Sequence, residues 1–294
     1  MRRIVSWLLV GIGAFLLVTA GLLQWYAPGK ALRVPLNVDS TTRLSGEATK
    51  LNPATGKLED LPVKVTSVTK VDPDKSDDDV VVWVNTVCAV IDERDVPDCV
   101  TKDDDRLISA SDDVFASDRR TGELIENAEE YIDDRADGRT GLMNKWPFGA
   151  KKRNYEVWDG LLKEPVIAEF QDEEDLDGVT VYVYKSVVPE TDAEILTDVQ
   201  GIYSQEKTYY IEPVTGAILN QQQHEVRKLE NGDLVLDMAI EFTPEQVEVG
   251  VSDAKENLDR LELFFGPGKY LAAGLGLVAL LGGLALLMLD RRKV

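Results

Sequence analysis

Between Asn144 and Gly160, the sequence NKWPFGAKKRNYEVWDG holds the densest basic cluster outside the apolar chain ends, with four aromatic residues interleaved. Ammonium and guanidinium groups bind anions, and aromatic rings offer an apolar surface or a face for a cation. The segment therefore predicts a site for an anionic, partly apolar ligand such as a lipid. Its candidate ligand-binding residues are Lys145, Trp146, Phe148, Lys151, Lys152, Arg153, Tyr155 and Trp158.

The same segment also has a purely structural interpretation. Aromatic residues of ordered domains usually pack in the core, and the cations can pair with neighbouring acids. The sequence leaves both interpretations open.

Catalysis finds little support in the sequence. Serine triads and many metal sites depend on histidine, and the chain has only His224, in the run NQQQHEV. We interpret His224 as a half-exposed strand residue. No glycine-rich phosphate loop occurs, and nothing singles out one pair of the many carboxylates. We therefore expect a protein that is not an enzyme, with no catalytic residue, metal ligand or cofactor.

Acidic loops raise the question of calcium. The stretch that starts at Asp72 begins like an EF-hand loop, but its sixth position holds Asp77 instead of Gly and its twelfth holds Trp83 instead of Glu. The EF-hand motif therefore fails. A different surface calcium site, at Asp77–Asp79 or Asp103–Asp105, stays open.

Alternating and β-branched runs predict most of the secondary structure. We expect strands within 61–71, 80–87, 178–188, 207–220 and 232–242. A helix is expected from Ser252, as N-cap, to the Gly-Pro-Gly at 266–268. The fold class is then α+β: a β-rich domain with hairpins.

A Thr-Gly pair recurs three times, at 55–56, 121–122 and 215–216, each followed one residue later by Leu or Ile. Gly supplies the positive φ that a type I turn with a following bulge requires. The repeated pair therefore predicts hairpin corners, and Asn231-Gly232 predicts another.

Both chain ends are apolar enough to cross a bilayer. Ile4–Tyr26 and Tyr270–Leu289 carry no charge, and basic residues lie beyond both. The positive-inside rule then places both tips in the cytoplasm and the middle of the chain outside. The predicted parts are a cytoplasmic tip (1–3), transmembrane helix 1 (4–26), an acidic extracytoplasmic domain (27–268), transmembrane helix 2 (269–289) and a cytoplasmic tail (290–294).

The alternative for the first span is a cleaved signal peptide, but its apolar run continues beyond Ala20 and is longer than usual for such peptides. Ala279 and Gly283 form a small-xxx-small pair through which the two spans can touch. We expect an uncleaved anchor and two membrane spans.

The exterior placement also bears on the cysteines and on charge. Cys88 and Cys99 are close in sequence and would lie in an oxidising compartment, which predicts a disulfide. Six of the 32 basic residues and one of the 53 acidic residues lie outside Ala27–Gly268. The region Ala27–Gly268 therefore holds 26 basic and 52 acidic residues and carries a formal charge of −26. Nucleic acid is excluded as a general partner, because its phosphates require a basic face.

Four segments, DRRTGELI, WPFGAKKRNYEVWD, DGVTVYVYKSVV and YYIEPVTGAILN, lie in this order between the apolar ends. Together they resemble the actinobacterial family described as porin PorA, over nearly the whole chain. The resemblance implies a cell-envelope protein. Two spans around a large β-rich exterior domain are also similar, by analogy alone, to the architecture of CD36-class lipid receptors.

Three functions follow as hypotheses. The exterior domain binds or passes an apolar or anionic envelope component such as a lipid, or the protein contributes to a pore, or it is a non-catalytic scaffold for envelope proteins. Two apolar helices without polar lining argue against a self-sufficient pore.

Overall fold

The computed structural model describes residues 2–26, 29, 32–132, 138–265 and 267–291. The chain divides into two compact units. One is formed by Val34–Ala254, and the other by Met1–Arg33 together with Lys255–Val294.

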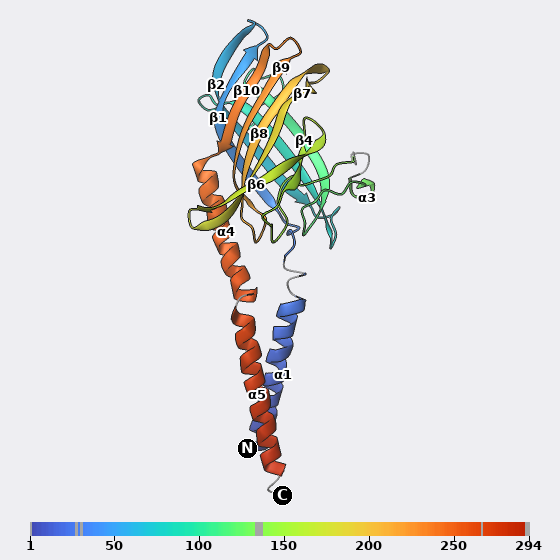
Figure 1. Cartoon of the computed structure of the whole chain (residues 1–294), viewed down its shortest axis with the longest axis vertical. Helices are drawn as coiled ribbons and strands as arrows, with labels where there is room; N and C mark the ends of the chain where they lie inside the picture. The colour runs from blue at the N-terminus through green and yellow to red at the C-terminus, as the bar shows by residue number, and fades with distance from the viewer. Residues whose placement is uncertain (1, 27–28, 30–31, 133–137, 266, 292–294) are drawn as a thin grey trace. The chain divides into compact units, whose positions relative to one another are not determined.

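The unit Val34–Ala254 is built on one antiparallel ten-stranded sheet, with strand order β4-β3-β2-β1-β10-β9-β8-β7-β6-β5 (Figure 1). The mostly β architecture with flanking helices confirms the predicted fold class. The strands are β1 (Asp39–Asn52), β2 (Lys57–Asp72), β3 (Val80–Ile91), β4 (Leu107–Asp118), β5 (Tyr155–Asp159), β6 (Glu164–Leu176), β7 (Val179–Leu196), β8 (Val199–Ile211), β9 (Ile218–Leu229) and β10 (Leu234–Phe242).

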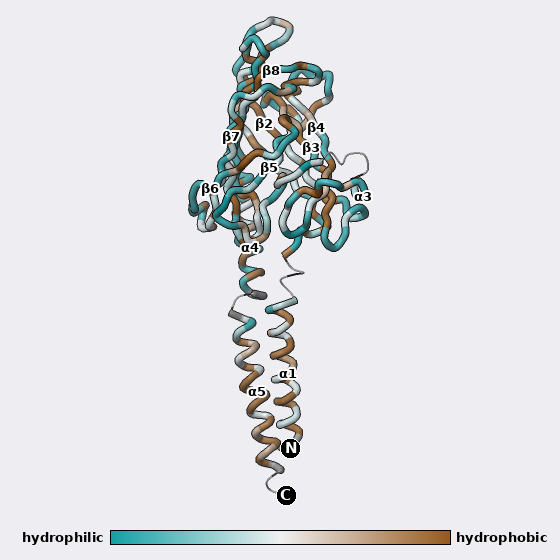
Figure 2. Tube along the Cα trace, turned by 45° about the vertical axis from the view of Figure 1, so that its right-hand side comes forward, coloured by the Kyte–Doolittle hydropathy of each residue, from teal (hydrophilic) through white to brown (hydrophobic). Residues whose placement is uncertain are grey.

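The sheet curls until its two edge strands are connected at one end (Figure 2). Ser117 of β4 pairs with Leu124, Glu123 pairs with Leu142, and Leu142 pairs with Val157 of β5. Short segments thus complete a ring of backbone pairing between β4 and β5. The predicted ligand segment, which begins just after Leu142 and includes β5, therefore lies at the closure of the sheet.

The five expected segments fall on β2, β3, β7, the hairpin of β8 and β9, and β10. Three connections fall on the expected Thr-Gly and Asn-Gly turns: β1 to β2, β8 to β9 and β9 to β10. The sequence did not predict β1, β4, β5 or β6. Their alternation is weak, since β4 begins ISASDD and β6 contains QDEED. Their neighbours' hydrogen-bonding edges impose the strand conformation on them.

The helix α4 (Pro244–Phe265) begins earlier than expected, so the prediction of Ser252 as N-cap was wrong. Thr243 takes that position instead: its hydroxyl accepts a hydrogen bond from the N–H of Gln246, at 3.2 Å. Pro244 fits the first helical turn because it has no N–H to leave unsatisfied. α4 packs on the sheet where Gly250 lies against Leu219 of β9.

The second unit contains α1 (Arg2–Trp25) and α5 (Pro267–Arg291), whose stretches Ile4–Trp25 and Gly268–Leu289 are long and apolar enough to cross a membrane (Figure 2). The two helices pack as an antiparallel pair. Their close contacts are Gly13 on Leu280, Gly276 on Leu16 and Leu17, and Gly283 on Ser6 and Val10.

The contact confirms Gly283 as an interface residue, and Gly276 is a further small residue of the close approach. Gly276 and Gly283 lie seven positions apart, two turns of the same helix face. Arg292 and Lys293, two of the basic residues from which the orientation is predicted, lie outside the described residues.

Candidate functional site

The three Thr-Gly corners share one hydrogen-bonding pattern, which starts four residues before the glycine. The side chains of Asn52, Asp118 and Glu212 each accept hydrogen bonds from the backbone N–H groups two and three positions ahead, at 2.6–3.2 Å. Each corner glycine, with φ of 66–76°, donates its N–H to the carbonyl oxygen of the same first residue, at 2.8–3.0 Å. The corners are therefore closed turns whose polar groups satisfy one another.

Two of these corners hold the segment Lys145–Gly149 between them. The N–H of Trp146 donates to the carbonyl of Gly216, at 2.9 Å, and the N–H of Phe148 donates to the carbonyl of Arg120, at 3.0 Å. A Cβ atom on Gly216 would come within 2.0 Å of the Trp146 carbonyl oxygen, so only glycine fits there. The corners thus position the predicted ligand segment.

Two of the four aromatic rings of the predicted ligand segment lie in the core. Trp146 is fully buried and Tyr155 is 7% exposed. The ring of Trp146 packs against Tyr184 and Tyr209, with centroids 5.5 and 4.8 Å apart, and Tyr155 meets Tyr184 edge-on at 5.6 Å. These rings stabilise the closure of the sheet by packing.

The other two rings are half-buried. Phe148 and Trp158 pack at the border of a second core that contains Trp83 and Phe115. Cations lie on both: Lys145 Nζ is 3.5 Å from the centroid of Phe148, and the Arg139 guanidinium is 5.9 Å from that of Trp158. Their cation–π geometry orients the rings toward charged groups.

The three consecutive cations Lys151, Lys152 and Arg153 are exposed on a loop whose backbone is hydrogen-bonded to two buried tyrosines. The hydroxyl of the fully buried Tyr184 donates to the carbonyl of Lys151, at 2.7 Å, and the N–H of Lys151 donates to the hydroxyl of Tyr155, at 2.9 Å. The aromatic core therefore holds the loop in one conformation.

Their side chains differ in what they contact. Lys152 pairs with Glu173 at 3.0 Å, which raises the pKa of its ammonium. Arg153 lies 4.8 Å from the ring centroid of Tyr155, whose hydroxyl raises the pKa of the guanidinium. All three basic side chains are exposed, which makes the loop a basic patch, here called the 151–153 loop.

Lys145 behaves differently from these cations. Its ammonium donates to the carbonyl of Thr215, at 2.9 Å, and is attracted by the carboxylates of Glu212 and Asp118. Burial lowers the pKa of Lys145 to about 7, although both carboxylates oppose that shift. The lysine therefore joins the two corners and is not part of the exposed patch.

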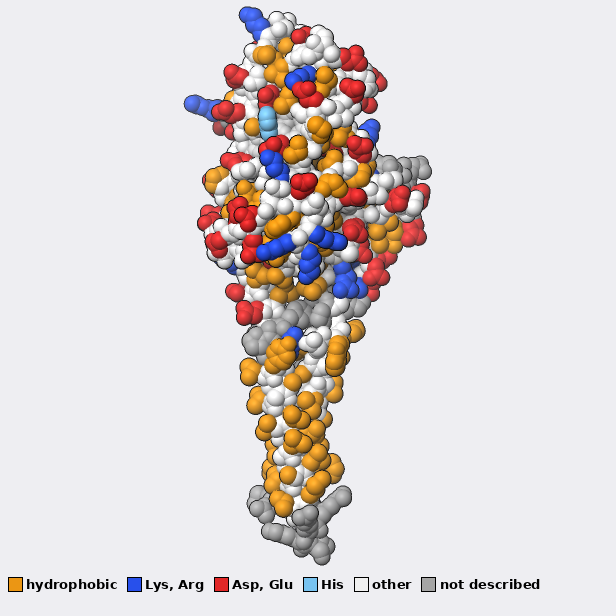
Figure 3. Space-filling model, viewed as in Figure 1, with side chains coloured by type: hydrophobic (Ala, Val, Ile, Leu, Met, Phe, Trp, Pro, Cys, Tyr) orange, Lys and Arg blue, Asp and Glu red, His pale blue; other side chains and the backbone are white. Residues whose placement is uncertain are grey.

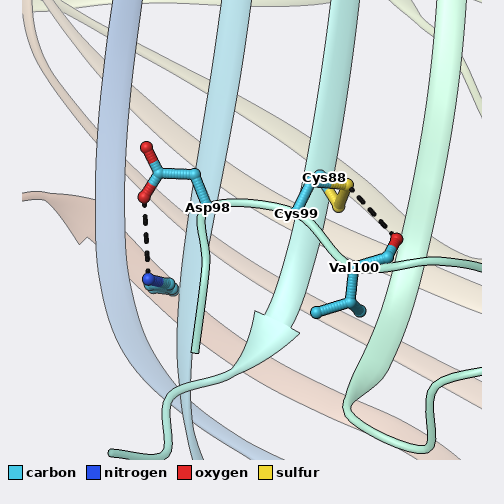
Figure 4. Close-up of a disulfide and its surroundings, with 5 residues drawn as sticks. Cys88, Asp98, Cys99 and Val100 are labelled. Carbon is cyan, nitrogen blue, oxygen red and sulfur yellow. Dashed lines mark hydrogen bonds and ion pairs between the residues drawn. A yellow bond between two sulfur atoms is a disulfide. The ribbon is translucent and has the colours of Figure 1, made fainter. Parts of the chain in front are cut away.

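A disulfide joins Cys88 and Cys99, as predicted, with Cα atoms 5.6 Å apart (Figure 4). Cys88 is buried in β3, and Cys99 belongs to the exposed loop that follows. The neighbouring Asp98 forms ion pairs with Arg43 of β1, at 3.1 Å, and Lys64 of β2, at 3.6 Å. The disulfide and these ion pairs attach the loop to the sheet.

The family model described as "Porin PorA" matches residues 5–285, nearly the whole chain. The chain belongs to this family. No match was found among curated proteins. Among solved structures, the chain is similar to an N-terminal dehydratase from the difficidin assembly line, at 8% identity over 81% of this chain and 87% of that one. The TM-score of 0.15 supports no conclusion about fold or activity.

In this member of the Porin PorA family, carboxylates of the acidic loops accept hydrogen bonds from nearby backbone N–H groups. Asp72 and Asp77 each accept two hydrogen bonds from backbone N–H groups of their own turns. The two bonds to Asp77, with a third from the hydroxyl of Tyr131, lower the pKa of Asp77. Arg106 forms a bidentate pair with Asp104 and lowers the pKa of that carboxyl to about 2. Among the described residues, no three His, Cys, Asp or Glu side chains form a metal site.

His224 of the Porin PorA chain is an exposed residue of β9, bonded through Nε2 to Asp237 of β10 at 2.7 Å. Sequence reasoning missed three other participants: the caps Asp118 and Glu212, and the anchor Tyr184. The caps had a detectable signal, because Asn, Asp or Glu stands three positions before each corner threonine. Tyr184 had none, since alternation alone does not reveal which loop a strand residue contacts.

Proposed function

We propose that this protein is a two-pass membrane protein with both termini in the cytoplasm and the sheet domain outside. The two helices and the family indicate a membrane location. The orientation rests on three supports: basic residues flank both spans on the terminal side, the antiparallel helices return the chain to the side where it began, and Cys88–Cys99 suits an oxidising compartment.

The orientation can be tested by labelling single cysteines with a membrane-impermeant maleimide in intact cells, in a background with Cys88 and Cys99 replaced by Ser. A cysteine at Ser252 should react, whereas one at Val294 should react only after permeabilisation. Labelling of Val294→Cys in intact cells would overturn the proposal.

For the exterior domain, we propose that the 151–153 loop binds the anionic head group of an envelope lipid. The observation that carries this proposal is the fixed backbone of three adjacent exposed cations in a region of formal charge −26. A rigid loop loses little conformational entropy on binding, and each cation near an anionic head group contributes about 1 kcal/mol. Because Trp146 and Tyr155 lie in the core, the rings support the loop and the cations provide the recognition.

The role is non-catalytic. His224 contacts Asp237, and within the described part of the chain no serine, threonine or cysteine side chain is hydrogen-bonded to it. Head-group binding needs neither a nucleophile nor a metal.

The test is native mass spectrometry of the full chain in dodecyl maltoside, titrated with phosphatidylglycerol. The variant with Lys151, Lys152 and Arg153 replaced by Gln should bind on the order of 100-fold more weakly, from the loss of about 1 kcal/mol per cation. The control replaces exposed Lys57, Lys70 and Lys255 by Gln. Equal binding by both variants would refute the site.

A pore is the second candidate, favoured by the family description. Conductance in planar bilayers containing the purified full chain tests it. Ionic currents that the Gly283→Leu variant abolishes would support a pore built on the helix pair.

A further inference from the structure

A groove of about 410 Å³ lies on the face of the sheet formed by β1, β10, β9 and β8. It is distant in sequence from the 151–153 loop and plays no part in the proposed head-group binding. Figure 3 shows this face, where the pale blue histidine lies among red acidic side chains. Its lining mixes carboxylate, amide, hydroxyl and imidazole groups.

The strand register explains why this surface is hollow. Across the sheet, Glu206, His224, Ala239 and Glu47 stand opposite one another in one row. The second row, two residues along, contains Thr208, Gln222, Glu241 and Ser45. Ala239 has the shortest side chain of both rows, and its neighbours His224, Glu47 and Glu241 have long ones. The groove is therefore open above Ala239 and walled by polar groups.

Its carboxylates are unevenly neutralised. Glu206 pairs with Lys185, at 2.7 Å, and Glu241 accepts a hydrogen bond from Gln222, at 3.2 Å. Within the described residues, the Glu47 carboxylate has no hydrogen bond or ion pair. Glu47 and Glu241 stand diagonally on adjacent strands, close enough for one cationic group to contact both. At this end of the groove, the Glu47 carboxylate has no donor and the Glu241 carboxylate has only the neutral amide of Gln222.

We propose that this groove binds an organic cation with at least two amino or guanidinium groups. One group lies above Ala239 between Glu47 and Glu241. A second group reaches Glu206, which is three strands away from Glu47, or about 14 Å at the usual strand spacing. Thr208 and Gln222 supply hydrogen bonds between the two.

A single metal ion does not fit this geometry. No three carboxylate or imidazole groups among the described residues converge on one point, and an ion cannot bridge the two ends. An extended polyamine matches both the spacing and the sign of the charges. The absence of an aromatic platform along the groove also disfavours a ligand recognised by stacking.

The experiment is isothermal titration of the full chain in dodecyl maltoside with spermidine, at about 150 mM NaCl, where long-range attraction is screened. Glu47→Gln with Glu241→Gln should weaken binding by about tenfold or more, from about 1 kcal/mol per exposed charge pair. Ala239→Leu should weaken it similarly without any change of charge, because the new side chain fills the hollow.

The matched control is Glu169→Gln with Glu174→Gln, which removes two exposed carboxylates of β6. It should bind spermidine like the wild type. If the control weakens binding as much as the groove variants, or if Ala239→Leu binds like the wild type, attraction is merely diffuse and the proposal fails. Unchanged melting temperatures verify that each variant is folded.

Discussion

Gly216 lies directly against the backbone of Trp146: a Cβ atom on Gly216 would come within 2.0 Å of the Trp146 carbonyl oxygen. Gly56 occupies the same position in the first corner, with nothing within 4 Å of such an atom. Both glycines have positive φ, 76° and 66°. The two turns therefore share their backbone conformation, and only Gly216 also holds another segment in place.

This difference predicts unequal costs for one substitution. Gly56→Ala should lower the free energy of unfolding by about 1–2 kcal/mol, the cost of the left-handed conformation. Gly216→Ala should lower it by about 3 kcal/mol or more, because backbone atoms must move as well. Denaturant unfolding of the full chain in detergent, followed by tryptophan fluorescence, measures both. Equal losses would mean that the contact with Trp146 does not stabilise the fold.

The pKa of Lys145 makes stability depend on pH. Burial holds this pKa at about 7, whereas the unfolded chain keeps the proton up to about pH 10.4. Between these values the unfolded state binds more protons, so the free energy of unfolding rises with pH. The stability of the wild type relative to Lys145→Met should therefore increase from pH 7 to pH 10. A difference that stays constant across this range would contradict the burial of the ammonium.

The disulfide offers a third prediction. Cys88 and Cys99 are separated by 11 positions, so the bond closes a short loop. Replacing both by Ser should destabilise the protein by about 2–3 kcal/mol, because a short loop gains little entropy when opened. The thermal shift of the double variant should match that of the reduced wild type. Free thiols in the native, unreduced protein would show that the bond does not form.

The helix pair gives a prediction with adjacent residues as its control. A Cβ on Gly283 would lie 2.8 Å from Val10 and 2.9 Å from the carbonyl oxygen of Ser6, whereas one on Gly282 meets nothing within 4 Å. Gly283→Leu should separate α1 from α5 and cost about 1–3 kcal/mol, as overpacking does. Gly282→Leu should behave like the wild type. Thermal denaturation in detergent distinguishes the two, and equal melting temperatures would argue against a close helix pair.

The sequence alone determined the features that depend on neighbouring residues. An uncharged apolar run of about 20 residues can satisfy its backbone in a bilayer only as a helix, so both apolar helices were predictable. The Thr-Gly corners were predictable because positive φ is a property of single residues. The cysteine pair was predictable from its short spacing and its expected compartment.

Tertiary structure decided how the aromatic and basic residues of 144–160 are divided. That segment is a loop without a regular period, so the sequence could not show that Trp146 faces the core while Lys151 faces solvent. The start of α4 at Pro244 also depended on context, since Gln246 accepts a hydrogen bond from the backbone N–H of Arg43.

The groove was beyond sequence reasoning for the same reason. Glu47 and Glu206 come from strands far apart in the chain, and only the register across β1, β10, β9 and β8 aligns them. A shift of one residue in any of these pairings would turn the side chains of one strand to the opposite face and break both rows. Register is set by packing over the whole sheet, which no local pattern encodes.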